Sequence, residues 1–459
     1  MADTFDVVVL GGGPAGYAFA LRAALLNLRV AIVERDKVGG TCLHRGCIPT
    51  KALLHAAEVM DAIGDASSLG ITVSDPTFEW AKVQSSKSEP IKKLHAGLQA
   101  VIKARKIETF IGNGTLAEPG TIEVDGTSVK GNHVVLAPGS YARSLPGMDP
   151  DGERIITSDD ALTSESFPSK IAIIGAGAVG VEFASVYRSF GSEVTVIEAL
   201  DRVIPMEDAD LSKELAAAFK KRGITTHVGA KVEDVDKSDG GVKLVVSKGN
   251  KTENIEVDTV LVAVGRGPST DGLDLERWGV RTDRGYIVID GENRAAENVW
   301  SIGDCTAGTP QLAHVAFGMG MATAERIAGG TPITVDFQRH VPRAIYCAPE
   351  VAAVGLTEAQ AKEQGYDVKV TKHSFAGNAK AQMMHAARGF AKVVVAKDGP
   401  ILGMHLIGPR VTELLAESLL TVGWEAMPAE VAAFVHPHPT LSEVVGEAAL
   451  EAIGKPLHG

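Results

Sequence analysis

Two of the four cysteines in this 459-residue sequence lie close together, in the segment 39-GGTCLHRGCIPTK-51. Cys42 and Cys47 are five positions apart, whereas Cys305 and Cys347 are isolated. A close pair of cysteines can form a structural disulfide, contribute to a metal site or act as a pair of redox-active thiols. In a chain with so few cysteines, such a pair is more often catalytic or metal-binding than structural.

The sequence favours redox-active thiols over the two alternatives. A zinc site would need two further Cys or His ligands at metal-binding spacing, and His44 is the one candidate inside the segment. A disulfide that closes a loop of only a few residues stabilises a fold little. We therefore expect no metal site, and we interpret Cys42 and Cys47 as a working redox pair.

A helix is expected to begin at the second cysteine. The segment 47-CIPTKALLHAAEVMDAI-63 has a helical pattern, and Pro49 falls in its first turn, where a missing N–H costs nothing. The positive end of a helix stabilises a thiolate, so Cys47 is well placed for redox chemistry. Three nearby glycines let the backbone bend and approach a flat ligand, namely Gly39, Gly40 and Gly46.

Two longer segments repeat one pattern without a gap, and the first of them directly precedes the cysteines. They are 7-VVVLGGGPAGYAFALRAALLNLRVAIVE-34 and 171-IAIIGAGAVGVEFASVYRSFGSEVTVIE-198. Each has an apolar run, the motif G-x-G-x-x-G, a helical pattern and a second apolar run that ends in glutamate. The short apolar runs 7–10 and 171–174 predict buried parallel strands. The repeat therefore predicts two dinucleotide-binding modules.

The three glycines of this motif, and the glutamate at the end of the second apolar run, each have their own physical role. The first glycine permits a tight turn, the second lets the backbone approach a pyrophosphate, and the third lets the helix lie close to the strand. These positions are Gly11, Gly13 and Gly16 in the first module, and Gly175, Gly177 and Gly180 in the second. Glu34 and Glu198 can each accept bonds from a ribose diol. A carboxylate at Glu198 would repel a 2′-phosphate, which favours NAD over NADP.

With these motifs, the sequence resembles the flavin-dependent pyridine-nucleotide disulfide oxidoreductases. The resemblance runs along the chain from 11-GGGPAG-16 to 436-HPHPTLSE-443. The motif G-G-T-C-L-x-x-G-C-I-P is specific for that family and is similar to its dihydrolipoamide-oxidising branch. The resemblance implies an α/β fold, with two Rossmann-like domains that bind FAD and NAD and an α+β C-terminal dimerisation domain. It also implies an enzyme that oxidises protein-bound dihydrolipoamide and reduces NAD+ through a Cys42–Cys47 redox disulfide.

The resemblance, together with a change of pattern after about residue 337, predicts how the domains follow one another. Helical patterns occur at 357–365 and 411–424, and the segment 390–408 is typical of a hairpin around a K-D-G-P turn. The expected segments are a first part of the FAD-binding domain (1–146), an NAD-binding domain (147–268), the continuation of the FAD domain (269–336) and an interface domain (337–459).

The family pattern also implies which residues bind the two cofactors. The FAD set is Gly11, Gly13, Gly16, Glu34, Lys51, Gly114, Gly139, Ser140, Asp304, Leu312, Ala313 and His314. The NAD set is Gly175, Gly177, Gly180, Glu182, Glu198, Val232 and Gly265. Lys51 and Glu182 are expected to form an ion pair beside the reactive nitrogen of the flavin. Three residues depart from the family pattern near the flavin, namely Pro138, Val315 and Met319.

The catalytic set implied by the resemblance is completed near the end of the chain. His438 and Glu443 match the family's H-P-T-x-S-E pair, in which the histidine is a base contributed by the other subunit of a homodimer. A histidine oriented by a carboxylate is a competent base near neutral pH. His436 matches a less critical position and is left out of the catalytic set. That set is Cys42, Cys47, Lys51, Glu182, His438 and Glu443.

Charge and hydropathy narrow the range of partners. A net charge of −12 and the lack of a Lys/Arg-rich run argue against nucleic acid as the main partner. No stretch approaches the ~18 apolar residues of a membrane span, and the acidic segment 1-MADTFDVVVL is not typical of a signal peptide. We expect a cytoplasmic homodimer that binds lipoyl domains and the acyltransferase core of a 2-oxoacid dehydrogenase complex.

Other members of the same family are alternative interpretations. Glutathione-type reductases usually carry a basic residue for NADPH near the position of Glu198, mercuric reductases add a C-terminal cysteine pair, and flavoprotein transhydrogenases lack the active-site pair. The present chain ends in 454-GKPLHG-459 and retains Cys42 and Cys47. A reductase of another small disulfide remains open, as does a protein whose main role is docking to a complex, or a redox-inactive regulator.

Overall fold

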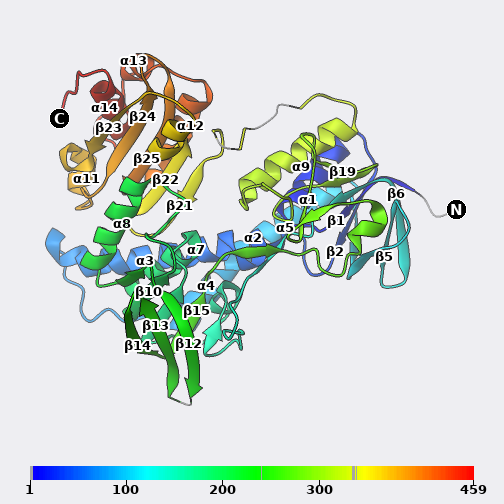
Figure 1. The fold of residues 1–459 in the computed structure, drawn as a ribbon, viewed down its shortest axis with the longest axis horizontal. Helices are drawn as coiled ribbons and strands as arrows, with labels where there is room; N and C mark the ends of the chain where they lie inside the picture. Colours follow the sequence, from blue (N-terminus) through cyan, green and yellow to red (C-terminus); the bar gives the residue numbers. More distant parts are fainter. Residues whose placement is uncertain (1–3, 239, 333–335, 338, 459) are drawn as a thin grey trace. The chain divides into compact units, whose positions relative to one another are not determined.

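The computed structural model describes residues 4–238, 240–332, 336–337 and 339–458 (Figure 1). The first three residues of the acidic N-terminal segment lie outside this range. The chain divides into two compact units. The first unit comprises residues 1–52, 81–143 and 266–335, and the second comprises 53–80, 144–265 and 336–459. The four predicted domain limits stay a prediction.

A largely parallel sheet forms the centre of the first unit. Its path is β19-β20-β6-β1-β2-β3, and β1 (Phe5–Leu10) pairs in parallel with β2 (Val30–Glu34) and β6 (Thr127–Leu136). The run 7–10 is buried throughout, which fits a strand covered on both faces and confirms the predicted strand. The other strands of the path are β3 (Glu108–Ile111), β19 (Arg294–Ala296) and β20 (Val299–Ser301).

Two helices of the first unit pack closely together, α1 (Pro14–Leu25) and α9 (Ala313–Ile327) (Figure 1). The closest approach is at Gly320, where a Cβ atom would lie 2.5 Å from the carbonyl oxygen of Ala15. Glycine at this position therefore lets the backbones meet. Arg22 and Glu325 form an ion pair of 2.5 Å between the same two helices.

Further elements complete the first unit. They are α2 (Gly40–Arg45), α5 (Ser88–Ala104), β4 (Gly114–Leu116), β5 (Thr121–Val124), β7 (Ser140–Ala142), β16 (Arg266–Pro268), the 3₁₀ turn η2 (Leu275–Trp278), β17 (Thr282–Asp283) and β18 (Tyr286–Ile287). Two helices contribute residues to both units, α3 (Cys47–Asp65) and α4 (Trp80–Ser86). The predicted helix over 47–63 is therefore confirmed, and it begins at Cys47.

The second unit contains a second parallel sheet with the path β11-β10-β9-β15-β8. Its strands are β8 (Ile155–Ile156), β9 (Lys170–Ile174), β10 (Glu193–Glu198), β11 (Thr225–Val228) and β15 (Thr259–Val262). The run 171–174 is buried within β9, as predicted. The helices α7 (Ala178–Ser189) and α8 (Ala209–Lys221) follow β9 and β10 along the chain.

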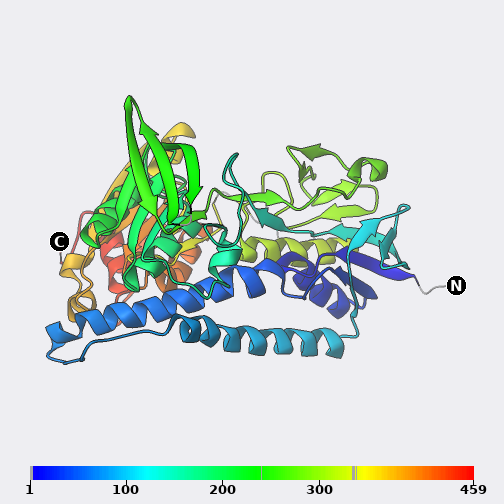
Figure 2. The same cartoon turned by 90° about the horizontal axis from the view of Figure 1, so that it is seen from below.

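An antiparallel ribbon was not anticipated from the sequence. It consists of β12 (Lys231–Ser238), β13 (Gly241–Lys248) and β14 (Lys251–Val257), drawn as long green arrows in Figure 2. Alternate residues of β13, among them Val242, Leu244 and Val246, are buried in one core with Ile174 and Val260 of the parallel sheet. The ribbon therefore covers the second dinucleotide module.

The C-terminal part of the second unit is an antiparallel sheet packed by helices. The sheet path is β21-β22-β25-β24-β23, with β21 (Arg343–Ile345), β22 (Glu350–Gly355), β23 (Val368–Ser374), β24 (Phe390–Ala396) and β25 (Ile401–Gly408). β24 and β25 form the predicted hairpin over 390–408. The predicted helices correspond to α10 (Glu358–Glu363) and α12 (Val411–Gly423).

The remaining elements of the second unit are short, apart from the last helix. They are η1 (Ala66–Leu69), α6 (Ser158–Ala161), η3 (Phe375–Gly377), α11 (Ala379–Met383), α13 (Pro428–Ala432) and α14 (Glu443–Ala452). Val444, Val445 and Ala448 of α14 are buried against the antiparallel sheet. Among the residues that the structure describes, no helix combines the length and the apolar character that a bilayer span requires.

Candidate active site

The two cysteines lie in adjacent helices of the first unit. Cys42 belongs to α2, and Cys47 is the first residue of α3. Both are thiols in the structure, and their side chains share a hydrogen bond. This bond, together with burial and the negative charge of Cys47, raises the pKa of Cys42, while the charge of Lys51 lowers it. A thiolate on Cys47 therefore disfavours a second thiolate on Cys42.

The structure adds Tyr17 to the surroundings of the pair, a residue that sequence reasoning missed. Burial raises the pKa of the Tyr17 phenol to about 12, and the charges of Cys42 and Cys47 act in the same direction. The ring lies against Phe317 of α9, with centroids 5.7 Å apart. Tyr17 therefore remains protonated at neutral pH. The signal in the sequence was its position directly after the last glycine of the first dinucleotide motif.

The two glutamates predicted to bind ribose hold their own glycine loops in the same way. In the first unit, Glu34 accepts from the backbone N–H groups of Gly12 at 2.7 Å and of Asp36 at 2.9 Å. In the second unit, Glu198 accepts from the N–H groups of Ala176 at 2.7 Å and of Leu200 at 2.8 Å. A carboxylate oxygen has a second lone pair, so each glutamate can also accept from a ribose hydroxyl.

The glycine loops leave helix N-termini available for a pyrophosphate. In the described part of the chain, no side chain caps α1 or α7, and the first turn of each helix contains no acidic residue. A Cβ atom at Gly177 would meet no atom within 4 Å, whereas one at Gly16 or Gly180 would lie 1.9 Å from the carbonyl oxygen of Gly11 or Gly175. These environments match the roles assigned to the glycines, and the residues fit FAD in the first unit and NAD in the second.

Hydrogen bonds connect two residues of the predicted flavin site, Ser140 and Asp304, with Arg266. Ser140 donates to Asp304 at 2.6 Å and accepts from the guanidinium of Arg266 at 2.7 Å. Gly139 precedes it with a positive φ of 78°. These hydrogen bonds fix the position of the Asp304 carboxylate. A contact of Asp304 with a bound flavin would require such a fixed position.

The other predicted flavin residues are distributed around the same sheet and around α9. A Cβ atom at Gly114 would lie 2.6 Å from the side chain of Leu10. Leu312 is the N-cap residue of α9, and Ala313 and His314 form its first turn. Of the residues that depart from the family pattern, Val315 and Met319 are buried on α9, and the Cα atom of Pro138 faces Gly11.

Lys51 and Glu182 lie on different helices in different units. Lys51 is one turn after Cys47 on α3, and its charge acts on Cys42. Glu182 is buried on α7 and accepts from the N–H of Tyr346 at 3.0 Å. The ion pair between Lys51 and Glu182 stays a prediction.

Two further residues of the predicted NAD set lie outside the glycine loop. Val232 is in β12 and packs partly buried against the core beneath the ribbon. Gly265 has a φ of +99°, and a Cβ atom there would meet no atom within 4 Å. Their contact with NAD stays a prediction.

The His438–Glu443 pair forms within the second unit. His438 Nδ1 donates to Glu443 Oε1 at 2.9 Å, and the N–H of Thr440 donates to Glu443 Oε2 at 2.8 Å. Partial burial alone would raise the pKa of Glu443, but these two bonds outweigh it and lower the pKa. The ionised carboxylate only accepts hydrogen bonds, so the proton of a neutral His438 lies on Nδ1. Nε2 then carries the lone pair that a base needs, and the His438 ring is largely exposed.

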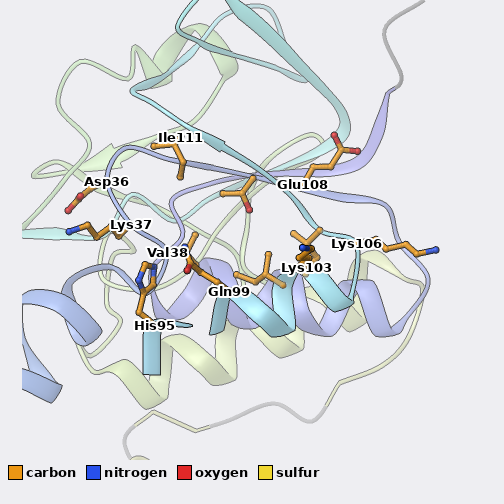
Figure 3. Close-up of a pocket in the computed structure, with 12 residues that line it drawn as sticks. Asp36, Lys37, Val38, His95, Gln99, Lys103, Lys106, Glu108 and Ile111 are labelled. Carbon is orange, nitrogen blue, oxygen red and sulfur yellow. The ribbon is translucent and has the colours of Figure 1, made fainter. Parts of the chain in front are cut away.

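A surface cleft lies beside the first dinucleotide module in the same unit (Figure 3). It is lined by the loop after β2, by α5 and by β3, and the labelled side chains include Lys37, Lys103 and Glu108. Asp36, whose N–H is bound by Glu34, lies at its edge. The cleft therefore adjoins the loop that follows Glu34 at the carboxyl end of β2.

The chain belongs to the pyridine nucleotide-disulphide oxidoreductase family, whose model matches residues 5–320. Residues 341–449 match the family's dimerisation domain. Dihydrolipoyl dehydrogenase of Bacillus subtilis (strain 168) is 41% identical to this chain over 475 aligned residues, and the alignment covers 100% of both chains. The enzyme of the same name from Zymomonas mobilis is 39% identical, again over the full length of both chains.

A solved structure gives the same result for the fold. LpdA from Mycobacterium tuberculosis superposes with a TM-score of 0.89 at 27% identity, covering 97% of this chain and 99% of that one. The predicted family and the predicted fold class, two dinucleotide-binding domains followed by a dimerisation domain, are therefore confirmed.

Proposed function

We propose that this enzyme oxidises protein-bound dihydrolipoamide to lipoamide and reduces NAD+ to NADH through a Cys42–Cys47 redox disulfide. The observation that carries the proposal is the hydrogen-bonded pair of thiols, with Cys47 at the N-terminus of α3 and Cys42 in the preceding helix. The pair directly follows a dinucleotide loop whose residues fit FAD. The relatives named dihydrolipoyl dehydrogenase support the choice of substrate.

The first half of the reaction is a thiol–disulfide exchange. His438 Nε2 takes the proton of one dihydrolipoamide thiol, and the resulting thiolate attacks Cys42 Sγ of the oxidised pair. The Cys42–Cys47 bond breaks, a mixed disulfide forms between substrate and Cys42, and Cys47 leaves as a thiolate. The positive end of α3 stabilises that thiolate.

The second half closes the lipoamide ring. The remaining substrate thiol, once deprotonated, attacks the substrate sulfur of the mixed disulfide, and Cys42 leaves. Because the pKa of Cys42 is raised beside Cys47, Cys42 takes up a proton and the reduced pair keeps one thiol and one thiolate. The substrate has then lost two protons, one to His438 and one to Cys42, and two electrons, which the cysteine pair has gained.

The dinucleotides are held by the residues of the two modules. Bound FAD would supply the electron transfer between the reduced cysteine pair and NAD, a chemistry that side chains do not provide. Gly13, Glu34, Ser140 and Asp304 belong to its proposed binding set, and Gly177 with Glu198 to that of NAD. Lys51 and Glu182 are proposed to carry their opposite charges beside the flavin.

The proposed setting is a 2-oxoacid dehydrogenase complex, in which lipoyl domains deliver the substrate and an acyltransferase core holds the enzyme. The dimerisation domain supports a homodimer. Within it, we propose that each His438 serves the cysteine pair of the other subunit. A catalytic thiol pair among only four cysteines fits a reducing compartment, so we propose a cytoplasmic location.

The test is a spectrophotometric assay of the purified protein with dihydrolipoamide, in which the formation of NADH is followed. NADP in place of NAD and glutathione in place of dihydrolipoamide serve as parallel controls. We expect turnover with NAD and dihydrolipoamide alone, and at least about a thousandfold loss in a Cys47→Ser variant. A yellow protein whose thiols cycle with NADH but which does not oxidise dihydrolipoamide would rule out the proposed substrate.

A further inference from the structure

One histidine of the motif 436-HPHPTLSE-443 has no place in the proposed reaction, yet it is fixed more firmly than the base. His436 Nε2 donates to Glu417 Oε1 of α12 at 2.7 Å. The side chain of His436 is 12% exposed, whereas that of His438 is 68% exposed. A bond of this length between an imidazole and a partly buried carboxylate restrains both side chains strongly.

A second contact fixes the ring of His436 against the last helix. A Cβ atom added to Gly446 of α14 would lie 2.5 Å from Nδ1 and 2.7 Å from Cε1 of His436. The ring therefore rests directly on the helix backbone, and this contact requires glycine at position 446. The two preceding residues, Phe434 and Val435, are exposed and offer no comparable anchor.

The hydrogen bond of His436 to Glu417 and the contact of its ring with Gly446, together called the anchor, lie close enough to His438 to restrict its position. Only Pro437 separates the two histidines, and the proline ring fixes one of the intervening backbone angles. The carbonyl of Pro437 accepts from the Thr440 hydroxyl at 2.7 Å, and the N–H of Thr440 donates to Glu443. The segment is thus held by α12 at His436 and by α14 at both Gly446 and Glu443.

We infer that His436 and Glu417 are positioning residues that hold the exposed base His438 on Glu443, with its proton on Nδ1 and its lone pair on Nε2. This inference rests on the proposed function, since it assigns His436 and Glu417 a role, through His438, in the deprotonation of dihydrolipoamide. The charged and titratable groups around the segment are Glu443 of α14, His436 with Glu417 of α12, and His458, whose charge also acts on Glu443. Without the anchor, the exposed ring rotates away from Glu443 and presents the wrong nitrogen.

The kinetic test compares substitutions that remove the bond with substitutions that keep it. We expect His436→Ala and Glu417→Ala to lower kcat with dihydrolipoamide about ten- to a hundredfold while KM changes much less, since misplacing a catalytic group by about 1 Å has effects of this size. Glu417→Gln retains an oxygen that accepts from His436 Nε2 and is expected to retain most of the activity. The double alanine variant should be little worse than either single variant.

Two controls separate positioning from a general loss of structure. Reduction of the cysteine pair by NADH, followed with ferricyanide as the acceptor, does not use His438 and should be unchanged in all the variants. His373→Gln alters another buried histidine paired with α14, through Glu451 at 3.4 Å, without touching the segment. If the ferricyanide and dihydrolipoamide activities fell in parallel, His436 and Glu417 would have only a structural role, and the inference would be overturned.

The decisive measurement is nitrogen NMR of histidine-labelled resting enzyme, with the His438 signals assigned from a His438→Gln sample. We expect neutral His438 to carry its proton on Nδ1 in the wild type and in His373→Gln, and to average over both tautomers in His436→Ala. An unchanged tautomer in His436→Ala would overturn the inference. Since this measurement needs no turnover, it answers the question even if dihydrolipoamide proves not to be the substrate.

Discussion

Single residues explain why the dinucleotide sites were predictable and the surroundings of the base were not. The positions of Glu34 and Glu198 at the ends of their strands followed from the motif spacing, whereas their bonds to the N–H groups of Gly12 and Ala176 were not predicted. The partner of His436 is Glu417, 19 residues earlier on another helix, and neither spacing nor composition indicates that contact. Tyr17 was missed for a similar reason, because its neighbours Cys42 and Cys47 approach it only in the folded chain.

At the residue scale, Glu198 should determine the choice between NAD and NADP. Glu198→Arg removes the acceptor for the Ala176 and Leu200 N–H groups and replaces a charge that repels a 2′-phosphate with one that attracts it. We expect kcat/KM for NAD to fall at least about tenfold and that for NADP to rise. Steady-state kinetics with both nucleotides tests this. Glu193→Arg, an exposed residue of the same strand, is the control, and an unchanged preference in Glu198→Arg would contradict the role of Glu198.

At the scale of elements, a buried charge cluster within the second unit joins the parallel sheet region to the antiparallel sheet. Lys392 of β24 is almost fully buried and donates to Asp208 at 2.8 Å, to Asp210 at 2.7 Å and to Glu358 at 2.9 Å. The hairpin that contains Lys392 was predicted correctly from its apolar runs. Its partners Asp208 and Asp210 lie more than 180 residues earlier, which local patterns cannot reveal.

The pKa values of the cluster set the pH range in which it stabilises the fold. Burial would raise the pKa of Asp208 and Asp210, but bonds from Lys392, and for Asp210 also from Lys372, lower it. Bonds from Lys362 and Lys392 lower the pKa of Glu358. Carboxyls with a lowered pKa in the folded state contribute stability above their ordinary pKa of about 4, and that contribution is lost as the pH falls below it.

Replacing Lys392 should therefore have a pH-dependent cost. Lys392→Met leaves three carboxylates around a buried position, and we expect a loss of about 3–5 kcal/mol at pH 7. The difference from the wild type in the midpoint of thermal unfolding should shrink as the pH falls below about 4.5, where the carboxyls take up protons. Scanning calorimetry between about pH 3 and pH 7 measures it. Lys397→Met, which removes an exposed pair with Asp367, should change little at any pH.

At the scale of the whole molecule, the order of the chain through the two units was the hardest feature to predict. Helices α3 and α4 both carry the chain between the units. A helical pattern shows where a helix forms and gives no sign of which unit each of its turns joins. The family resemblance supplied the number and the order of the domains.

Shared catalysis between subunits is the prediction that belongs to this scale. We expect Cys42→Ser and His438→Gln homodimers each to be nearly inactive, and mixed dimers to regain activity at one of their two sites. Co-expression with two different affinity tags isolates the heterodimer for assay. A heterodimer that forms and remains inactive would show that each subunit contains a complete site.

The close approach of α1 and α9 at Gly320, and the contact of His436 with Gly446, have a consequence for how the chain tolerates random mutagenesis. At both positions an added Cβ atom would lie 2.5 Å from its neighbour, which is a backbone oxygen at Gly320 and the His436 ring at Gly446. Alanine would therefore disturb the contact between the helices in the first case and displace the His436 ring in the second. Gly64 of α3 and Gly97 of α5 are helical as well, but a Cβ atom there meets nothing within 4 Å. Alanine at those sites should even add about 0.5–1 kcal/mol of stability. A library selected for folded protein should therefore retain glycine at 320 and accumulate alanine at 64 and 97, and a library selected for dihydrolipoamide oxidation should retain glycine at 446 as well. Equal substitution at all four sites under both selections would contradict this expectation.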